Sequence, residues 1–263
     1  MKLENYELHL PSYSVGKEVY NQIGKICKPY GTKVLVIGGK KALSAAFDKI
    51  SKNAADGGLD IIGKEIYGTD CTYEAVERLA ALTSFQEADM VFAVGGGKAI
   101  DTCKCLCIEC EKPVFTFPTI ASNCAACTSV SIMYHEDGTF FKPHFFTHPA
   151  AHAFIDTQII AAAPYRYLWA GIGDTYAKNY EAEISSRGEK LPHYTKVGVG
   201  FSKMCLTPML EYGRQALEDN KKGVATEALE QVALAIVVTT AIVSIFLTRD
   251  FTPDYNSGLA HAC

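Results

Sequence analysis

Three glycines followed by a lysine, at residues 95–98, are the part of the chain best suited by residue type to bind a phosphate group. They follow the apolar run 90–94, which predicts a strand buried on both faces, and precede a helical pattern over 99–110. Glycines at such a junction let the backbone approach a ligand closely, and the first turn of the helix offers free N–H groups to an anion. The spacing matches neither a Walker A loop nor GxGxxG, so a tight turn without a ligand is the alternative interpretation.

Asp174 and His261 are side chains of types that can bind a metal ion, and each has a plainer interpretation. Asp174 follows Gly-Ile-Gly inside a segment with a helical pattern, where a carboxylate is costly to bury unless it is paired or metal-bound. A helix-capping aspartate is the alternative interpretation. His261 lies in the apolar segment 257–263, and taken alone it would be a partly buried histidine without a metal.

Three further histidines, His144, His148 and His152, are spaced four residues apart, which would align them on a helix. Pro143 and Pro149 interrupt such a helix. We therefore expect a strand or loop in this segment, and no metal bound there.

The ten cysteines predict reduced, buried thiols rather than disulfides or a zinc cluster. The four between 103 and 110 share one helical segment, where most pairs point to different faces and the paired spacing of a zinc site is absent. Cys124 and Cys127 form a CxxC motif without the βαβ context of a thioredoxin-like site. A cysteine-based metal or redox protein is therefore the least favoured interpretation.

Composition places the chain among ordinary globular proteins. Its 263 residues are 48% hydrophobic and 21% charged, which is enough apolar surface for a packed core. The net charge of −4 and the lack of a basic stripe argue against a nucleic-acid partner. The N-terminus lacks an apolar signal-peptide region, and the apolar stretch 232–247 is shorter than a membrane span. We therefore expect a cytoplasmic protein without a membrane partner.

Hydrophobic periodicity indicates two kinds of architecture along the chain. The first part alternates short apolar runs with helical patterns, which predicts a parallel sheet covered by helices. The later part contains helical patterns alone. Strands are expected at 33–37, 59–67, 90–94 and 114–117, and helices at about 40–55, 73–87, 99–110, 165–187, 195–219 and 226–248. We accordingly expect an α/β domain over 1–160 and a helical domain over 161–263.

Five segments together resemble the glycerol dehydrogenases within the iron-containing alcohol dehydrogenase superfamily. Residues 95–102 resemble its GGGKxxDT segment and 118–122 its PTxAS loop. Residues 129–138 resemble the next strand and turn, 171–174 the GIGD segment, and 258–262 the first metal-histidine segment. They occur in family order and cover most of the chain.

The resemblance implies a dehydroquinate synthase-like fold, in which a nucleotide-binding α/β domain precedes a helical domain and the active site lies between them. The helical domain would be incomplete in this chain, because the family's third metal ligand, a histidine, belongs to a later segment. The resemblance assigns metal binding to Asp174 and His261. Lys178 stands where iron-type members carry a histidine, which favours zinc over iron. NAD or NADP would contact Gly95, Gly96, Gly97, Lys98, Ala99, Thr119, Ser122, Thr128, Val130 and Tyr134.

Cys124 narrows the substrate that the resemblance implies. Glycerol dehydrogenases carry at this position an aspartate that contacts the polyol, whereas a Cys-Ala-Ala loop is similar to the hydroxycarboxylate dehydrogenase branch. Without that carboxylate an anionic 2-oxo acid is not repelled. We therefore expect hydride transfer between NAD(P) and a 2-hydroxy acid/2-oxo acid pair. Glycerol dehydrogenase is the alternative activity, and a non-catalytic dinucleotide-binding relative is the alternative of another class.

Lys40 and Lys41 follow the first predicted strand, where an acidic residue would favour NAD. Their charges would tolerate a 2′-phosphate, so we expect use of NADP or of both cofactors. A solvated helix start is the alternative interpretation of the two lysines. An incomplete helical domain also exposes apolar surface, from which we expect a homo-oligomer.

Overall fold

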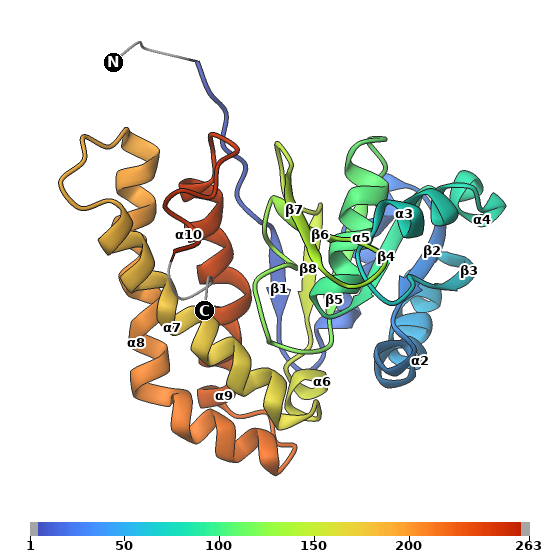
Figure 1. Cartoon of the computed structure of the whole chain (residues 1–263). Helices are drawn as coiled ribbons and strands as arrows, with labels where there is room; N and C mark the ends of the chain where they lie inside the picture. Colours follow the sequence, from blue (N-terminus) through green and yellow to red (C-terminus); the bar gives the residue numbers. More distant parts are fainter. Residues whose placement is uncertain (1–4, 259–263) are drawn as a thin grey trace.

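The computed structural model describes residues 5–258 of the chain. In Figure 1 a sheet with its flanking helices lies on the right, and a group of long helices lies on the left. Within the described residues, six parallel strands form one sheet in the order β1-β8-β5-β4-β2-β3. Their bounds are β1 (Tyr13–Val15), β2 (Lys33–Gly38), β3 (Asp60–Ile66), β4 (Met90–Gly95), β5 (Val114–Pro118) and β8 (His152–Ile155).

Helices cover both faces of this sheet because its central strands are apolar on both sides. Every residue of β4 and β5 is buried. Alternate residues of a strand point to opposite faces, so Val91 packs in one cluster and Phe92 in the other. The flanking elements are η1 (Val19–Gln22), α1 (Ile23–Cys27), η2 (Lys28–Tyr30), α2 (Lys40–Asp56), α3 (Tyr73–Ala80), α4 (Thr83–Glu87) and α5 (Gly97–Ile108). The apolar runs of the sequence thus become the middle layer of an α/β sandwich.

A separate antiparallel hairpin packs against α5. It consists of β6 (Val130–Tyr134) and β7 (Phe140–Phe145). His144 lies in β7, His152 in β8 and His148 in the loop between them, so the expected strand or loop in this segment is confirmed. Helix α5 carries Cys103, Cys105 and Cys107, which are buried free thiols. Cys110 lies just beyond the end of this helix and is exposed.

The second part of the chain is helical, as expected. It comprises α6 (Thr157–Ala161), α7 (Tyr165–Ser185), α8 (His193–Lys221), α9 (Glu227–Leu234), the π-helix η3 (Ala235–Thr239) and α10 (Thr240–Leu247). Its apolar side chains are continuous with those of the sheet, since Leu168 and Val237 belong to the same buried cluster as Val91. The expected fold class, a parallel α/β sheet followed by helices, is therefore confirmed.

The last three helical segments form one run, Glu227–Leu247, which is longer than the apolar stretch noted in the sequence. The run has 21 residues, and its most apolar 18-residue window has a mean hydropathy of 2.0, so it is long and apolar enough to cross a membrane. The expectation that this stretch is too short is therefore wrong on length. Of its most apolar window, 67% is buried inside the fold, as in the core helix of a globular protein.

Two other boundaries differ from those expected. The helix expected over 73–87 is divided into α3 and α4, because Leu82 has an extended backbone and starts the second helix. The helix expected from 99 starts at Gly97, inside the glycine run. This second difference matters, because it puts two of the first four free N–H groups of α5 on Gly96 and Gly97.

Candidate functional site

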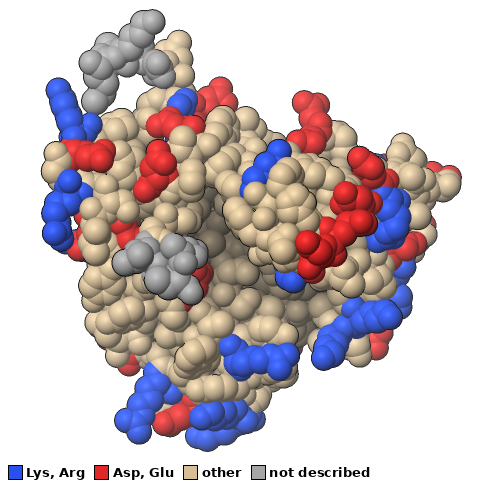
Figure 2. All heavy atoms as spheres, viewed as in Figure 1, with Lys and Arg blue, Asp and Glu red and all other residues tan. Residues whose placement is uncertain are grey.

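A cleft of about 1110 Å³ runs along the carboxyl ends of the sheet strands and the start of α7. Its walls come from the turns that follow β2, β3, β4 and β5 and from the connection between α6 and α7. Figure 2 shows a hollow across the middle of the molecule, with Lys and Arg side chains along its lower side. Ligands of open α/β sheets bind at this edge, where the strand order reverses.

The glycine turn forms the floor of the cleft. Gly95 has a φ of +154°, and a Cβ there would lie 2.9 Å from the Cβ of Ala99. Gly96 is the N-cap of α5 and caps it without a side chain, so the first N–H groups of this 12-residue helix are left for a ligand. A Cβ at Gly96 would lie 2.5 Å from Ile120 Cδ1. Close neighbours therefore leave no room for a side chain at Gly95 or Gly96.

Lys98 adds a positive charge at the helix start. Its ammonium forms an ion pair with Asp70 and lies 5.4 Å from the centre of the Tyr134 ring. The hydrogen bond to Asp70 raises the pKa of Lys98 above its ordinary value. The side chain therefore stays protonated and is held by Asp70 at the start of α5.

The structure brings together most, but not all, of the residues expected to contact a dinucleotide. Those lining the cleft are Gly95, Gly96, Gly97, Lys98, Ala99, Thr119, Ser122 and Tyr134. Thr128 and Val130 are not among the lining residues. Instead, the Thr128 hydroxyl and the Val130 carbonyl accept hydrogen bonds from the buried ammonium of Lys104, at 3.2 and 2.6 Å.

Lys104 braces the helix that carries the glycine turn. It is fully buried, and its Nζ lies 3.0 Å from Asp101 Oδ1. The second carboxylate oxygen, Asp101 Oδ2, accepts from the backbone N–H of Ile132 at 3.2 Å. The pair therefore ties α5 to the β6–β7 hairpin, and the fully buried Lys104 ammonium has no solvent to replace a lost partner.

The change Lys104→Ala is expected to lower the free energy of unfolding by about 3 kcal/mol, because it leaves a buried carboxylate without its cation. Urea unfolding followed by circular dichroism measures this loss. The matched control is Lys203→Ala, since the Lys203 side chain is 72% exposed and forms only a surface ion pair at 3.6 Å. A loss below about 1 kcal/mol for the Lys104 variant contradicts the bracing role.

Asp174 lies on α7, outside the set of residues that line the cleft. Three residues before it, a Cβ at Gly171 would lie 2.3 Å from the carbonyl oxygen of Ala121, so α7 packs directly on the loop after β5. Burial raises the pKa of Cys124 in that loop to about 12, and the negative charge of Asp174 contributes to the increase. Asp174 and Cys124, expected to bind metal and substrate, are therefore neighbours, although neither lines the 1110 Å³ cleft.

A complete metal site is not contained in the residues that the structure describes. Among residues 5–258 no three His, Cys, Asp or Glu side chains converge as metal ligands do. His261 lies outside the described residues. A half-buried carboxylate such as Asp174 is a donor that zinc accepts, so the described part is compatible with one ligand of a metal ion.

Arg166 and Tyr167 also line the cleft and were not anticipated from the sequence. Arg166 donates to the Tyr167 hydroxyl at 3.1 Å. This hydrogen bond, together with the positive charges of Arg166 and Lys41, lowers the pKa of Tyr167. Lys41 of α2 and Arg166 of α7 thus belong to one basic end of the cleft. No local motif marks Arg166, because the contact depends on how the two parts of the chain pack.

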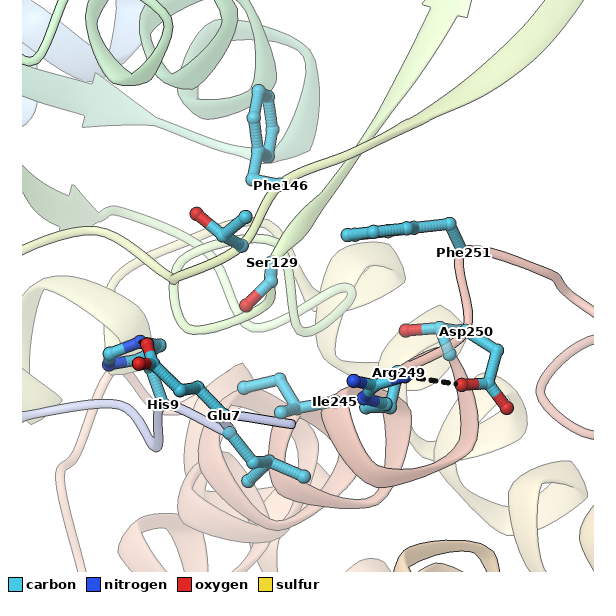
Figure 3. A pocket seen from close by; sticks show the side chains of 11 residues that line it. Glu7, His9, Ser129, Phe146, Ile245, Arg249, Asp250 and Phe251 are labelled. Atoms are coloured by element: carbon cyan, nitrogen blue, oxygen red, sulfur yellow. Dashed lines mark hydrogen bonds and ion pairs between the residues drawn. The ribbon is translucent and has the colours of Figure 1, made fainter. Parts of the chain in front are cut away.

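A second pocket, of about 510 Å³, has a different lining, although Ser129 in it stands between Thr128 and Val130 in the chain. Figure 3 shows it between the N-terminal segment, Phe146 and the end of α10. Its basic side chain, Arg249, forms an ion pair with Asp250 at 2.8 Å. Because none of the expected site residues lines it, this pocket is separate from the candidate site.

Comparisons with known proteins place this arrangement in a family. The sequence model of the family "Iron-containing alcohol dehydrogenase" matches residues 11–156. Glycerol dehydrogenase of Escherichia coli O6:H1 is 32% identical over 224 residues, which cover 84% of this chain and 61% of that protein. Hydroxycarboxylate dehydrogenase A of Escherichia coli K12 is 32% identical over 207 residues, which cover 78% of this chain and 56% of that protein.

A solved structure gives the same result for the fold. The crystal structure of glycerol dehydrogenase from Schizosaccharomyces pombe superposes with a TM-score of 0.81 at 24% identity, covering 97% of this chain and 64% of that one. The chain therefore spans less than two thirds of the length of these relatives.

Proposed function

The chain belongs to the iron-containing alcohol dehydrogenase family, and on that basis we propose that it transfers hydride between NAD(P) and a small 2-hydroxy acid/2-oxo acid pair. One observation carries the proposal: the glycine turn after β4 and the start of α7 wall the same cleft. The pyrophosphate would lie over Gly96 and Gly97 at the start of α5, with Lys98 as its counter-ion. Tyr134 and Thr119 would complete the contacts.

Cys124 supports an acid as the substrate. Its pKa of about 12 keeps the thiol neutral, so this loop presents no negative charge to a carboxylate. Similarity to hydroxycarboxylate dehydrogenase A agrees with this choice. The glycerol dehydrogenases among the relatives support the second candidate, oxidation of a polyol.

A divalent metal ion, zinc rather than iron in this proposal, would be held by Asp174 and His261 and would supply Lewis-acid polarisation of the substrate carbonyl. The chain itself would contribute the position of the Asp174 carboxylate. Gly171 lets α7 lie against the loop that carries Cys124, which puts the Asp174 carboxylate beside the expected substrate position. In the same loop Ala125 and Ala126, which follow Cys124, are buried.

The basic end of the cleft supports NADP as a cofactor. Lys40, Lys41 and Arg166 line it, and Asp101, the one acidic lining residue within the described chain, belongs to the glycine-turn helix instead. A 2′-phosphate there would accept hydrogen bonds from side chains at the starts of α2 and α7. NAD, which lacks this phosphate, would also fit but would make fewer contacts with the three cations.

Removing either cation is expected to weaken the binding of NADPH more than the binding of NADH. Lys41→Ala and Arg166→Ala should each weaken NADPH binding about tenfold, because a charge-assisted hydrogen bond contributes about 1.5 kcal/mol or more. NADH binding should change less than about twofold. Fluorescence titration of both nucleotides measures this, with exposed Lys196→Ala on α8 as the control. Equal losses for NADH and NADPH contradict a 2′-phosphate contact.

We also propose two domains, a cellular compartment and a partner for the chain. The dinucleotide-binding domain would comprise residues 1–160 and the helical domain 161–263. We place the protein in the cytoplasm, with a small-molecule substrate and with a second copy of the chain as its partner. Exposed apolar side chains on α7 and α8, such as Trp169 at 61% and Leu210 at 66%, support contacts between copies.

Oxidation of NADH and NADPH by the purified chain, with and without zinc, tests the activity directly. Small 2-oxo acids and dihydroxyacetone serve as the competing substrates. Zinc-dependent turnover of a 2-oxo acid supports the proposal, and turnover of dihydroxyacetone alone supports the polyol candidate. Nucleotide binding without turnover of either indicates a non-catalytic dinucleotide-binding relative.

A further inference from the structure

Three sulfur-bearing side chains from three different parts of the α/β sandwich meet in the core beside α5. They are Cys71 in the loop between β3 and α3, Cys105 on α5 and Met133 on β6. Cys71 Sγ and Cys105 Sγ each lie 3.4 Å from Met133 Sδ. The two thiols also share a hydrogen bond. The three sulfurs, which we call the sulfur triad, are therefore in mutual contact.

The sulfur triad is almost closed to solvent. Cys71 and Met133 are 0% exposed and Cys105 is 4% exposed, and all three belong to one buried apolar cluster. Both cysteines are free thiols. Thiols and thioethers can simply fill a gap in a core, as small or flexible apolar groups. Packing alone does not require sulfur to meet sulfur, however, whereas the binding of a soft metal ion does.

Backbone contacts and an ion pair fix the three positions relative to one another. The backbone N–H of Tyr134, next to Met133, donates to the Cys71 carbonyl at 2.9 Å. Asp70, which precedes Cys71, forms an ion pair with Lys98 at the start of α5. Helix α5 in turn packs against both α3 and β6. The donor atoms are therefore held together before an ion binds, which lowers the ordering cost of binding.

We propose that the sulfur triad is a binding site for monovalent copper, Cu(I). Thiolate and thioether sulfurs are the soft ligands that this ion takes in proteins. Zinc is held by Cys, His, Asp and Glu side chains, and no three of these converge within residues 5–258. The third donor here is a methionine instead. This site is separate from the zinc site of the proposed function and does not depend on it.

A small movement of one side chain makes room for the ion. A metal–sulfur bond of about 2.3 Å sets the sulfurs of a planar three-coordinate site about 4 Å apart. The two 3.4 Å contacts must therefore lengthen by about half an ångström. Both contacts are made by Met133, whose side chain has three rotatable bonds. Adjustment of Met133 alone lengthens both.

Binding exchanges two protons for one cation. Each thiol loses its proton to solvent, each of the three sulfurs donates an electron pair to Cu(I), and no electron is transferred. The hydrogen bond with Cys105 and burial raise the pKa of the Cys71 thiol, whereas a hydrogen bond from Thr102 lowers it and so favours the thiolate. Because two protons leave, the apparent affinity should rise about a hundredfold from pH 6 to pH 7.

Competition with bathocuproine disulfonate, without oxygen and with ascorbate present, measures the Cu(I) affinity of the chain. One ion should bind, and X-ray absorption at the copper edge should show three sulfur neighbours. Met133→Leu removes one sulfur at similar volume, so affinity should fall at least about tenfold and copper should lose one sulfur neighbour. Cys71→Ser and Cys105→Ser should each lower the affinity at least about a hundredfold.

Three further variants show whether the effect is specific to the sulfur triad. Cys27→Ser removes another buried thiol, and Cys127→Ser breaks the CxxC motif. Asp174→Asn removes the proposed zinc ligand. Each should keep the Cu(I) affinity within about twofold of the parent, because none of these residues contributes a sulfur to the triad. NADPH titration and urea unfolding, run on every variant, show which of them keep the fold, and only those are compared.

Four results overturn the proposal. The parent chain binds no Cu(I), so that the sulfurs only fill the core. The bound copper has nitrogen or oxygen neighbours. Met133→Leu keeps the parental affinity and sulfur count. Cys127→Ser loses as much affinity as Cys71→Ser or Cys105→Ser, so that the CxxC motif holds the ion. Should either serine variant at the triad fail to fold, the volume-conserving Met133→Leu variant decides.

Discussion

Asp174→Asn is expected to lower zinc-dependent turnover at least about a thousandfold, because the carboxylate is the proposed ligand of the metal that polarises the substrate. NADH and NADPH affinities should change less than about twofold, since Asp174 lies outside the cleft that would hold the dinucleotide. Steady-state kinetics with a 2-oxo acid, zinc analysis of the purified variant and nucleotide titration together measure the effect.

A carboxylate elsewhere on the same helix provides the control for Asp174. Glu183 lies nine residues further along α7 and forms an exposed ion pair with Lys203 at 3.6 Å. Glu183→Gln should therefore leave turnover and zinc content unchanged. If Asp174→Asn retains its zinc and most of its turnover, Asp174 is not a metal ligand. A helix-capping role is then also excluded, because α7 starts at Tyr165, well before this residue.

Gly96→Val is expected to weaken binding of both nucleotides at least about a hundredfold. The new side chain would compete with Ile120 Cδ1, which lies 2.5 Å from the ideal Cβ, and would fill the space where the backbone meets a pyrophosphate. Ile120 lines the same cleft, so its displacement also narrows the site. Fluorescence titration with NADH and NADPH measures the loss.

The control variant is Gly200→Val, which introduces the same side chain into another helix, away from the cleft. Gly200 lies on α8, and a Cβ there would have no neighbour within 4 Å. Gly200→Val should leave nucleotide binding unchanged. If Gly96→Val folds cooperatively and binds NADPH within about threefold of the parent, the glycine turn is a tight turn without a ligand, as the alternative interpretation holds.

Much of the architecture follows from local patterns in the sequence. The apolar run at 90–94 predicts β4 because a strand buried on both faces has no polar alternation. The glycine turn could likewise be placed, since a strand before it and a helix after it are both local features. The division of α3 from α4 was missed because the helical periodicity continues through Leu82, although its backbone does not.

The candidate site required the packed chain as well. The resemblance implies cofactor contacts for Thr128 and Val130, yet both lie against Lys104, a buried cation that no sequence pattern distinguishes from a surface lysine. Arg166 reaches the basic end of the cleft only because α7 starts opposite α2. The members of the sulfur triad stand in separate segments of the sequence, and their contact comes from the fold.

By itself, the sequence determined the kinds of elements, their order, and the residue types at the ends of β4 and α7, because these depend on neighbours within a few positions. The tertiary structure decided which side chains share the cleft, which charges are buried against each other, and that the three sulfurs of the sulfur triad meet in the core. Such contacts join residues that lie far apart along the chain. They depend on the packing of whole helices and strands, which no local periodicity encodes.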